Sequence, residues 1–354
     1  MTPGRHNAIT DVPGIEVGHA TDHEALTGTT VILARAGAVA GVDVRGAAPG
    51  TRETELLEPG NLVQTVQAIV LSGGSAFGLD AAGGVMRYLE EQGLGQAVGP
   101  GRVPIVPAAV IFDLDLGSWS KRPTAEFGYR AAEGASSGRP AMGNVGAGTG
   151  ARAGGLKGGV GSASAILEIS AGRVVVGALA VVNAVGRAHD PVTGALHGRA
   201  LALGDEFNLV DGTRVAGPGT QGANDYADLF PTNGSLAGRN TTIGVVATDA
   251  RLDKAQARKL SQMAHDGLAR AIRPAHTMFD GDTIFALATG ERELFGPAEL
   301  TRLAAVASDA FTRAIVHGMI AAKGAGGFES YCEAYPERCG AGISGVAGSR
   351  AGNR

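Results

Sequence analysis

Short apolar runs alternate along the chain with longer stretches of helical periodicity. Runs rich in Val, Ile, Leu and Ala predict strands over residues 29–34, 68–71, 163–169, 173–183, 243–248 and 283–288. Apolar positions at three- and four-residue steps predict amphipathic helices over residues 252–272 and 297–318. A further helix is expected over residues 76–91, ending before Gly93. The alternation predicts a mixed fold of the α/β or α+β class.

Glycine is the unusual feature of a composition that is otherwise typical of a folded globular protein. The chain has 354 residues, 57 of them glycine, with 44% apolar and 18% charged residues. So much glycine indicates tight turns and places where two chain segments approach closely. No linker divides the sequence, so we expect a single domain over residues 1–330. A net charge of −4 argues against nucleic acid or an anionic membrane as a partner.

The two ends of the chain carry little structural pattern. The first residues contain no apolar signal-peptide core, and the longest apolar run, residues 174–182, is about half the length that spans a bilayer. We therefore expect a cytoplasmic protein without a membrane span. We expect residues 331–354 to form a flexible tail. Cys332 and Cys339, within that tail, are expected to be free thiols in a reducing cytosol, with a disulfide as the alternative.

Two glycine-rich segments imitate nucleotide-binding loops but lack the required context. Residues 146–151 follow no predicted strand, and residues 72–75 lie between a strand and a helix but lack the lysine of a P-loop. Asp113 and Asp115 do not have the spacing of a metal-ligand set. Neither a cofactor nor a metal is expected.

A candidate nucleophile, Thr241, stands just before the strand predicted over residues 243–248. It follows Asn240 and a glycine-punctuated stretch over residues 212–239. A threonine hydroxyl is a weak nucleophile unless a base lies beside it, and an α-amino group freed on the same residue is such a base. Its reference pKa of about 7.7–8.0 leaves a useful neutral fraction near pH 7. On these residues alone, an ordinary turn into a strand remains the alternative.

Two aspartates and two isolated polar residues are further candidates. Asp280 and Asp282 precede a predicted strand, where residues two apart face one side. Paired carboxylates there could handle protons or bind a divalent cation, and a solvated Asp-Gly turn is the other alternative. Lys157 is the one cation in the glycine-rich run 154–159, and stabilisation of an oxyanion competes with plain surface exposure. Asn183 ends an apolar strand, where an oxyanion-hole donor competes with a strand-end cap.

Several segments match one protein family in their order along the chain. They are residues 11–19 (DVPGIEVGH), 71–79 (LSGGSAFGL), 238–248 (GRNTTIGVVAT) and 280–286 (DGDTIFA). Together they resemble the L-aminopeptidase/D-esterase and β-aminopeptidase family, which includes nylon-oligomer endohydrolase, over nearly the whole chain. The resemblance implies a four-layer αββα sandwich like that of N-terminal-nucleophile hydrolases. It also implies a homotetramer of αβ units, a small peptide-like or oligoamide substrate, and no cofactor.

The resemblance implies that the chain cleaves itself between Asn240 and Thr241. Thr241 would attack the Asn240 carbonyl, form an ester, and be freed by water. The products would be an α chain over residues 1–240 and a β chain over residues 241–354. Thr241 would then attack the substrate carbonyl, with its own α-amino group as general base, which makes the protein a self-processing amide-bond hydrolase.

The same resemblance assigns roles to the other candidates. Asn183 matches the family's oxyanion-hole asparagine. Lys157 matches the active-site lysine of the nylon-oligomer branch, and Asp280 and Asp282 match the paired aspartates of that branch.

The chain departs from the family pattern around Phe112. Residues 107–113 lack the glutamate that the aminopeptidase branch presents to a free amino group, and Phe112 stands in the substrate pocket where an active-site tyrosine is expected. Two other functions therefore stay open. One is acyl transfer, as in ornithine acetyltransferase, and the other is binding of a small ligand on a degenerate enzyme scaffold.

Overall fold

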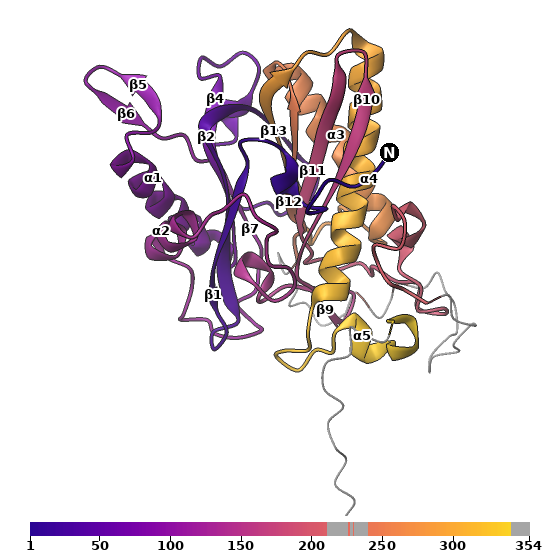
Figure 1. The fold of residues 1–354 in the computed structure, drawn as a ribbon. Coiled ribbons are helices and arrows are strands. Elements are labelled where there is room, and N and C mark those ends of the chain that lie inside the picture. Colours follow the sequence, from indigo (N-terminus) through magenta and orange to yellow (C-terminus); the bar gives the residue numbers. More distant parts are fainter. Residues whose placement is uncertain (211–225, 227–228, 230–239, 341–354) are drawn as a thin grey trace, which may run out of the picture.

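Helices cover both outer faces of two packed layers of strands (Figure 1). The computed structural model describes residues 1–210, 226, 229 and 240–340. One strand layer contains β1 (Glu16–Asp22), the first part of β2 (Thr27–Val44), β3 (Thr51–Arg52), β4 (Thr65–Ser72) and β7 (Ala108–Val110). The other contains the last part of β2 with β10 (Val160–Ile169), β11 (Gly172–Val181), β12 (Ile243–Ala250) and β13 (Thr283–Arg292).

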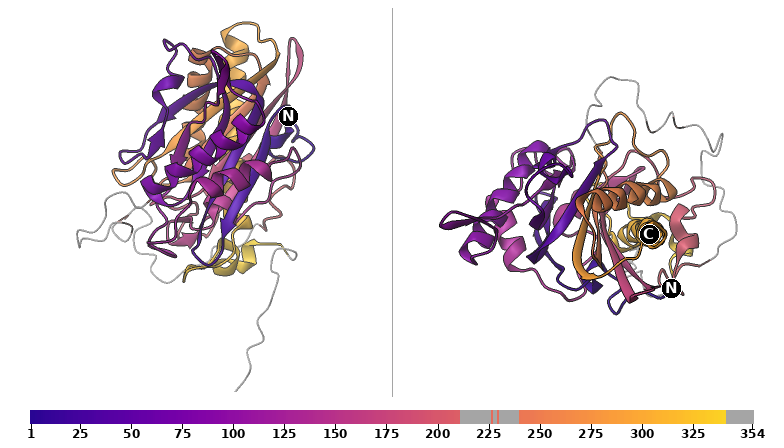
Figure 2. Two further views of the ribbon diagram at one scale, coloured as in Figure 1. Left: turned by 90° about the vertical axis from the view of Figure 1, so that its left-hand side faces the viewer. Right: turned by 90° about the horizontal axis from the view of Figure 1, so that it is seen from above.

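Each strand layer has its own pair of helices, seen from two further sides in Figure 2. Helices α1 (Ala81–Glu91) and α2 (Ala125–Glu133) pack against the first layer, and α3 (Lys254–Ala271) and α4 (Pro297–Ala321) against the second. Smaller elements are β5 (Gln96–Val98), β6 (Gly101–Val103), β8 (Arg152–Ala153), β9 (Leu156–Lys157) and α5 (Tyr331–Ala334).

Three apolar cores separate the four layers. Alternate residues of β2 and β4, such as Val31 and Val70, face α1 and α2. Their neighbours, such as Ile32, meet Phe285 and other residues of the second layer in a core built largely of strand residues. The remaining faces of β10–β13 pack on α3 and α4. The αββα sandwich implied by the sequence is confirmed.

Strand β2 belongs to both layers, which joins them into one hydrogen-bonded ladder of order β10-β11-β12-β13-β2-β4-β7-β3, with β1 also paired to β2. Its first part pairs with β1 and β4, and its last part with β13. The pairing with β4 is irregular between Leu33 and Ala38. Such an irregularity lets a strand bend, so β2 can pass from one layer to the other.

The pairing of β12 brings three chain segments to one end of the second layer. Ile243 pairs antiparallel with Val181 of β11 and parallel with Thr283 of β13. The residues that follow β11 therefore lie beside the residues that precede β12 and β13. These are the positions of the predicted candidates.

The strands and long helices predicted from the sequence are present, but β2 ends at Val44, ten residues beyond its predicted end at residue 34. The helix expected over residues 76–91 is α-helical only from Ala81, since Ser75–Asp80 form a 3-10 helix. Strand β1 and helix α2 were not predicted. Helix α4 is long and apolar enough to cross a membrane, but most of it is buried against the strands and α3, as in a core helix.

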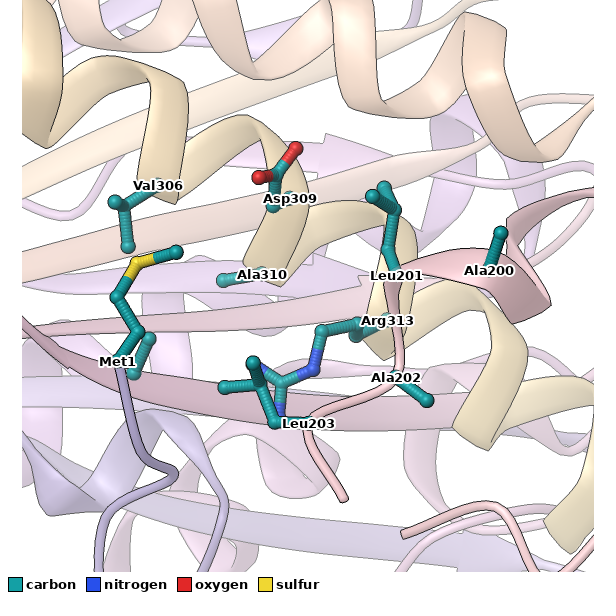
Figure 3. Close-up of a pocket in the computed structure, with 10 residues that line it drawn as sticks. Met1, Ala200, Leu201, Ala202, Leu203, Val306, Asp309, Ala310 and Arg313 are labelled. Atoms are coloured by element: carbon teal, nitrogen blue, oxygen red, sulfur yellow. The ribbon is translucent and has the colours of Figure 1, made fainter. Parts of the chain in front are cut away.

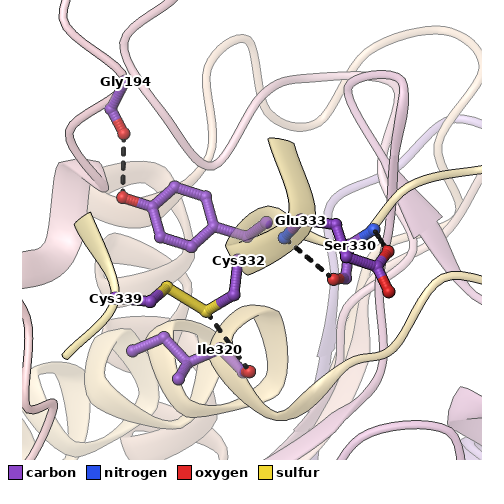
Figure 4. The surroundings of a disulfide bond; sticks show 7 residues. Gly194, Ile320, Ser330, Cys332, Glu333 and Cys339 are labelled. Atoms are coloured by element: carbon purple, nitrogen blue, oxygen red, sulfur yellow. Dashed lines mark hydrogen bonds between the residues drawn. A yellow bond between two sulfur atoms is a disulfide. The ribbon is translucent and has the colours of Figure 1, made fainter. Parts of the chain in front are cut away.

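The free thiols and the flexible tail predicted from residue 331 are wrong as far as residue 340; residues 341–354 lie outside the described part. Cys332 and Cys339 form a disulfide (Figure 4). Tyr331 is buried, and its hydroxyl donates to the Gly194 carbonyl at 2.9 Å. Ser330 caps α5 by accepting a hydrogen bond from the Glu333 amide. Tertiary packing orders this segment although its sequence has no periodicity.

A buried charged network fastens residues 200–207 to α4. Arg313 of α4, beside a hollow of about 220 Å³ (Figure 3), donates from Nε and Nη2 to the Glu206 carboxylate at 2.6 Å each. His317 and Asn7 also contact Glu206, at 3.0 and 2.6 Å. Burial opposes ionisation of Glu206, but hydrogen bonds from His317, Arg313, the Leu203 amide and Asn7 outweigh it and hold the pKa of Glu206 below its usual value.

We predict that Glu206→Gln lowers the free energy of unfolding by about 3–5 kcal/mol at pH 7, because it leaves the buried Arg313 without its counter-charge. Since the pKa of Glu206 is lowered on folding, its contribution is complete above the unfolded-state pKa of about 4.3 and declines as pH falls below it. Urea unfolding at pH 7 and pH 4 measures both effects. Glu168→Gln, which removes an exposed pair with Arg173, is the matched control and should change stability by at most about 1 kcal/mol.

Candidate active site

Thr241 lies two residues before β12, where the three chain segments meet. Its amide donates to the Asn183 carbonyl at 2.6 Å, and its hydroxyl donates to the carbonyl of Asn240, the residue before it, at 2.5 Å. Only 4% of the residue is exposed. The hydroxyl is therefore held against the peptide bond that the sequence predicts it to cleave.

The amide of Gly281 lies within hydrogen-bond distance of both oxygens of this contact. Gly281 N lies 3.2 Å from Thr241 Oγ1 and 3.3 Å from the Asn240 carbonyl oxygen. A Cβ at this position would lie 2.4 Å from the Ala48 carbonyl oxygen and 2.9 Å from Thr241 Oγ1, so only glycine fits without displacement. One N–H thus faces both the hydroxyl and the carbonyl oxygen that would become an oxyanion.

Asp280 and Asp282 are both buried, which excludes the solvated turn. Asp280 accepts hydrogen bonds from the Val185 amide at 3.3 Å and from the amide and hydroxyl of Thr277 at 3.0 and 2.6 Å. Asp282 accepts from the Thr242 amide at 2.8 Å and from His276. Burial, and then repulsion by Asp282, raises the pKa of Asp280 above its usual value.

Lys157 is fully buried, contrary to the surface alternative. Its ammonium donates to three backbone carbonyls, those of Gly148, Ala151 and Gly158, at 3.0, 2.7 and 2.7 Å. Burial lowers the pKa of Lys157 to about 7, opposed in part by the charge of Asp113. Lys157 therefore ties together the backbone of residues 148–158 and titrates near neutral pH.

Asp113 is a buried carboxylate that the sequence did not single out as functional. It accepts hydrogen bonds from the Thr27 hydroxyl at 2.6 Å and the Gly74 amide at 2.7 Å. Burial raises its pKa to about 6. Its position directly after Phe112 was the available signal, but Thr27 and Gly74 are too distant in the sequence to reveal its contacts.

Asn183 links the nucleophile segment to the residue that replaces the family tyrosine. Its side-chain oxygen accepts from the Arg152 amide at 3.0 Å, and its Nδ2 lies 3.5 Å from the Phe112 carbonyl oxygen. Its backbone carbonyl accepts from the Thr241 amide. The Phe112 ring packs edge-to-face on Trp119, with 5.9 Å between ring centroids.

The predicted candidates thus lie in one place, some joined by backbone pairing and others through intervening hydrogen bonds. Asn240, Thr241, Asp280 and Asp282 lie in adjoining backbone segments, with Asn183 beside them. Lys157 donates to the Ala151 carbonyl, and the amide of the next residue, Arg152, donates to the Asn183 side chain. The Phe112 carbonyl oxygen faces Nδ2 of the same asparagine. Gly238 and Arg239, also part of the predicted cleavage segment, lie outside the described residues. Within the described part of the chain, no cluster of three His, Cys, Asp or Glu residues is arranged to hold a metal.

This arrangement can be compared with known proteins. The sequence model of peptidase family S58 matches residues 7–332. The protein belongs to peptidase family S58.

Relatives of this S58 protein agree with that assignment. It is 45% identical to an uncharacterised aminopeptidase of Mycobacterium leprae, with 96% of this chain and 97% of the relative aligned. It is 33% identical to the 6-aminohexanoate-oligomer endohydrolase of Kocuria sp., over 82% of this chain and 77% of that enzyme. The family resemblance predicted from sequence motifs is confirmed.

A solved structure agrees in fold. L-aminopeptidase D-Ala-esterase/amidase from Ochrobactrum anthropi, described as a variant of the Ntn hydrolase fold, superposes with a TM-score of 0.68 at 24% identity, covering 91% of this chain and 88% of that one. The S58 protein therefore has this fold. Its family and its sequence relatives make it a hydrolase of peptide or amide bonds.

We predict that Lys157→Met changes how the stability of this S58 protein depends on pH. The folded wild type releases the lysine proton near pH 7 and the unfolded chain near pH 10.5, so the unfolded state binds more protons between these values. Wild-type stability should therefore rise with pH in this window by up to about 1.4 kcal/mol per pH unit relative to the variant. Urea unfolding at pH 6, 7, 8 and 9 measures it. Parallel profiles would show that Lys157 stays charged throughout.

Proposed function

We propose that this protein is a self-processing hydrolase in which Thr241 is first the agent of chain cleavage and then the N-terminal nucleophile. The observation that carries the proposal is the contact of the Thr241 hydroxyl with the Asn240 carbonyl at 2.5 Å, with the Gly281 amide directed at both oxygens. Reacting groups held in such proximity gain a large entropic advantage.

Self-cleavage proceeds as an N-to-O acyl shift followed by hydrolysis. Thr241 Oγ1 attacks the Asn240 carbonyl carbon; the new C–O bond replaces the C–N bond, and the hydroxyl proton ends on the Thr241 nitrogen. The Gly281 N–H stabilises the negative oxygen of the tetrahedral intermediate. Water then hydrolyses the ester to give a carboxylate on Asn240 and a free Thr241. The products are residues 1–240 and residues 241–354.

In turnover, the freed α-amino group of Thr241 takes the proton of its own hydroxyl as that oxygen attacks the substrate carbonyl. The Asn183 carbonyl already accepts a hydrogen bond from this nitrogen, which would keep the amine oriented. Asn183 Nδ2 and the Gly281 N–H are the donors for the substrate oxyanion, and Lys157 holds the loop beside them. Gly281 would replace the donor that is lost with Phe112 in place of tyrosine.

The substrate class is a small peptide-like or oligoamide molecule. Asp280 and Asp282, like the aspartates of the nylon-oligomer branch, support oligoamide cleavage. The relative from Kocuria is named as an endohydrolase of 6-aminohexanoate oligomers. The missing glutamate within residues 107–113 weakens recognition of a free amino terminus. We therefore expect cleavage of oligoamides whether or not their amino end is blocked.

We predict that purified protein resolves into two chains, one of them beginning Thr-Thr-Ile-Gly-Val-Val. Intact mass and N-terminal sequencing check this directly. Thr241→Ala should give one uncut chain without amidase activity, because no other group supplies the nucleophile. Activity is measured with a 6-aminohexanoate trimer and with free and acetylated aminoacyl p-nitroanilides.

Thr242→Ala is the matched control, since Thr242 Oγ1 lies 3.3 Å from the Asn183 carbonyl oxygen and has no part in the reaction. This variant should still be cut before residue 241. An uncut wild-type chain with full activity, or an active Thr241→Ala, would overturn the proposed mechanism.

We predict that Gly281→Ala slows self-cleavage by roughly 100–1,000-fold, the usual effect of losing one oxyanion donor. The added methyl group would meet the Ala48 carbonyl and the Thr241 hydroxyl, so the amide must move away from its oxygens. Gel densitometry of freshly translated protein measures the rate. Gly83→Ala in α1, where a Cβ meets no atom within 4 Å, should process normally. Equal rates in both variants would remove Gly281 from the mechanism.

A further inference from the structure

His276 is the imidazole in direct contact with an active-site carboxylate. It lies in the connection between α3 and β13. Its Nδ1 is 2.8 Å from Asp282 Oδ2, and its own backbone amide donates to the same oxygen at 3.1 Å. The other oxygen of Asp282 accepts from the Thr242 amide at 2.8 Å. Asp282 therefore joins His276 to the backbone next to the nucleophile.

The two ring nitrogens of His276 have different surroundings. Asp282 can only accept when ionised, so Nδ1 must be the donor. Its Nε2 is buried and has no hydrogen-bond partner among the described residues. The ring packs edge-to-face on His265, with 4.9 Å between centroids. The His265 ring is fully buried and contacts the Asp43 carbonyl through Nε2 at 3.0 Å.

The backbone of His276 is also unusual. Its φ is +57°, in the left-handed region that few residues other than glycine adopt and in which Asn, Asp and His are the most frequent of those. A residue kept in such a conformation is held there by its surroundings, and such residues concentrate at functional sites. Here the conformation directs both the amide and the ring nitrogen of one residue at a single carboxylate oxygen.

His276 and Thr277 each form hydrogen bonds with a different one of the two aspartates. Thr277 donates twice to Asp280, and His276 donates twice to Asp282. The two carboxylates are thus held apart by neighbouring residues, and their mutual repulsion does not displace either. The second carboxylate oxygen of Asp282 accepts the hydrogen bond from the amide of Thr242, the residue after the nucleophile.

We propose that His276 is a positioning residue that orients the Asp282 carboxylate and, through it, the Thr241–Thr242 backbone for self-cleavage and turnover. This deepens the proposed function and rests on it. His276 does not touch the substrate, so its loss lowers kcat and the processing rate and leaves KM unchanged. Displacement of a reacting group by about 1 Å costs on the order of 100-fold in rate.

Three substitutions at position 276 separate this role from a merely structural one. His276→Asn places an N–H donor near the position of Nδ1 and tolerates a positive φ. His276→Gly tolerates the same φ without any side-chain donor. His276→Gln carries its donor one atom farther out, near the position of Nε2. Melting temperatures and circular dichroism of all three variants report the fold.

The measurements are the self-cleavage rate and the kcat and KM for a 6-aminohexanoate trimer. We expect His276→Asn to stay within about 3-fold of wild type, and His276→Gly and His276→Gln to lose about 10- to 100-fold in both rates at unchanged KM. Wild-type rates for His276→Gly, equal losses for Asn and Gly, or unfolding of all three variants would overturn the positioning role. Failure of the proposed function is distinguishable, because it shows in the wild type as an active chain without a Thr241 terminus.

Discussion

The pairing of β12 with β11 on one side and β13 on the other is the constraint on which the site depends. Antiparallel pairing with β11 places Asn183 beside Thr241, and parallel pairing with β13 places Asp280–Asp282 beside the same residue. A one-residue slip would turn every apolar side chain of β12 to the opposite face, so two buried cores enforce the register. The geometry of the nucleophile is thus a product of core packing.

In the candidate site, the buried ionisable groups are held by the backbone more than by opposite charges. The Lys157 ammonium is surrounded by three carbonyls, while Asp113, Asp280 and Asp282 accept backbone N–H groups. Burial shifts the pKa values of Lys157, Asp113 and Asp280, and their backbone partners are fixed dipoles that do not titrate. The abundance of glycine explains how this is possible, since Gly74 and Gly281 bring their amides close to side chains where a Cβ would collide.

Much of this site could be predicted because Thr241, Asp280 and Asp282 stand immediately before strands and Asn183 immediately after one. Alternation and motif order locate such positions. His276 and Asp113 could not be found this way, since their contacts depend on loop conformation and on residues distant in sequence, such as Thr27. The disulfide was missed for another reason. The prediction for Cys332 and Cys339 rested on the expected compartment, whereas the packing of Tyr331 brings the two residues together.

The order of the strands has a consequence for the lifetime of the cleaved protein. If residues 1–240 and 241–354 become separate chains as proposed, the β12–β13 pair of the second chain sits between β11 and β2 of the first. Neither polypeptide could then leave without breaking ladders on both sides. Unfolding would turn an intramolecular search into a bimolecular one, so recovery would depend on concentration. The mature molecule would persist because its chains come apart slowly, and refolding would become slower as the protein is diluted.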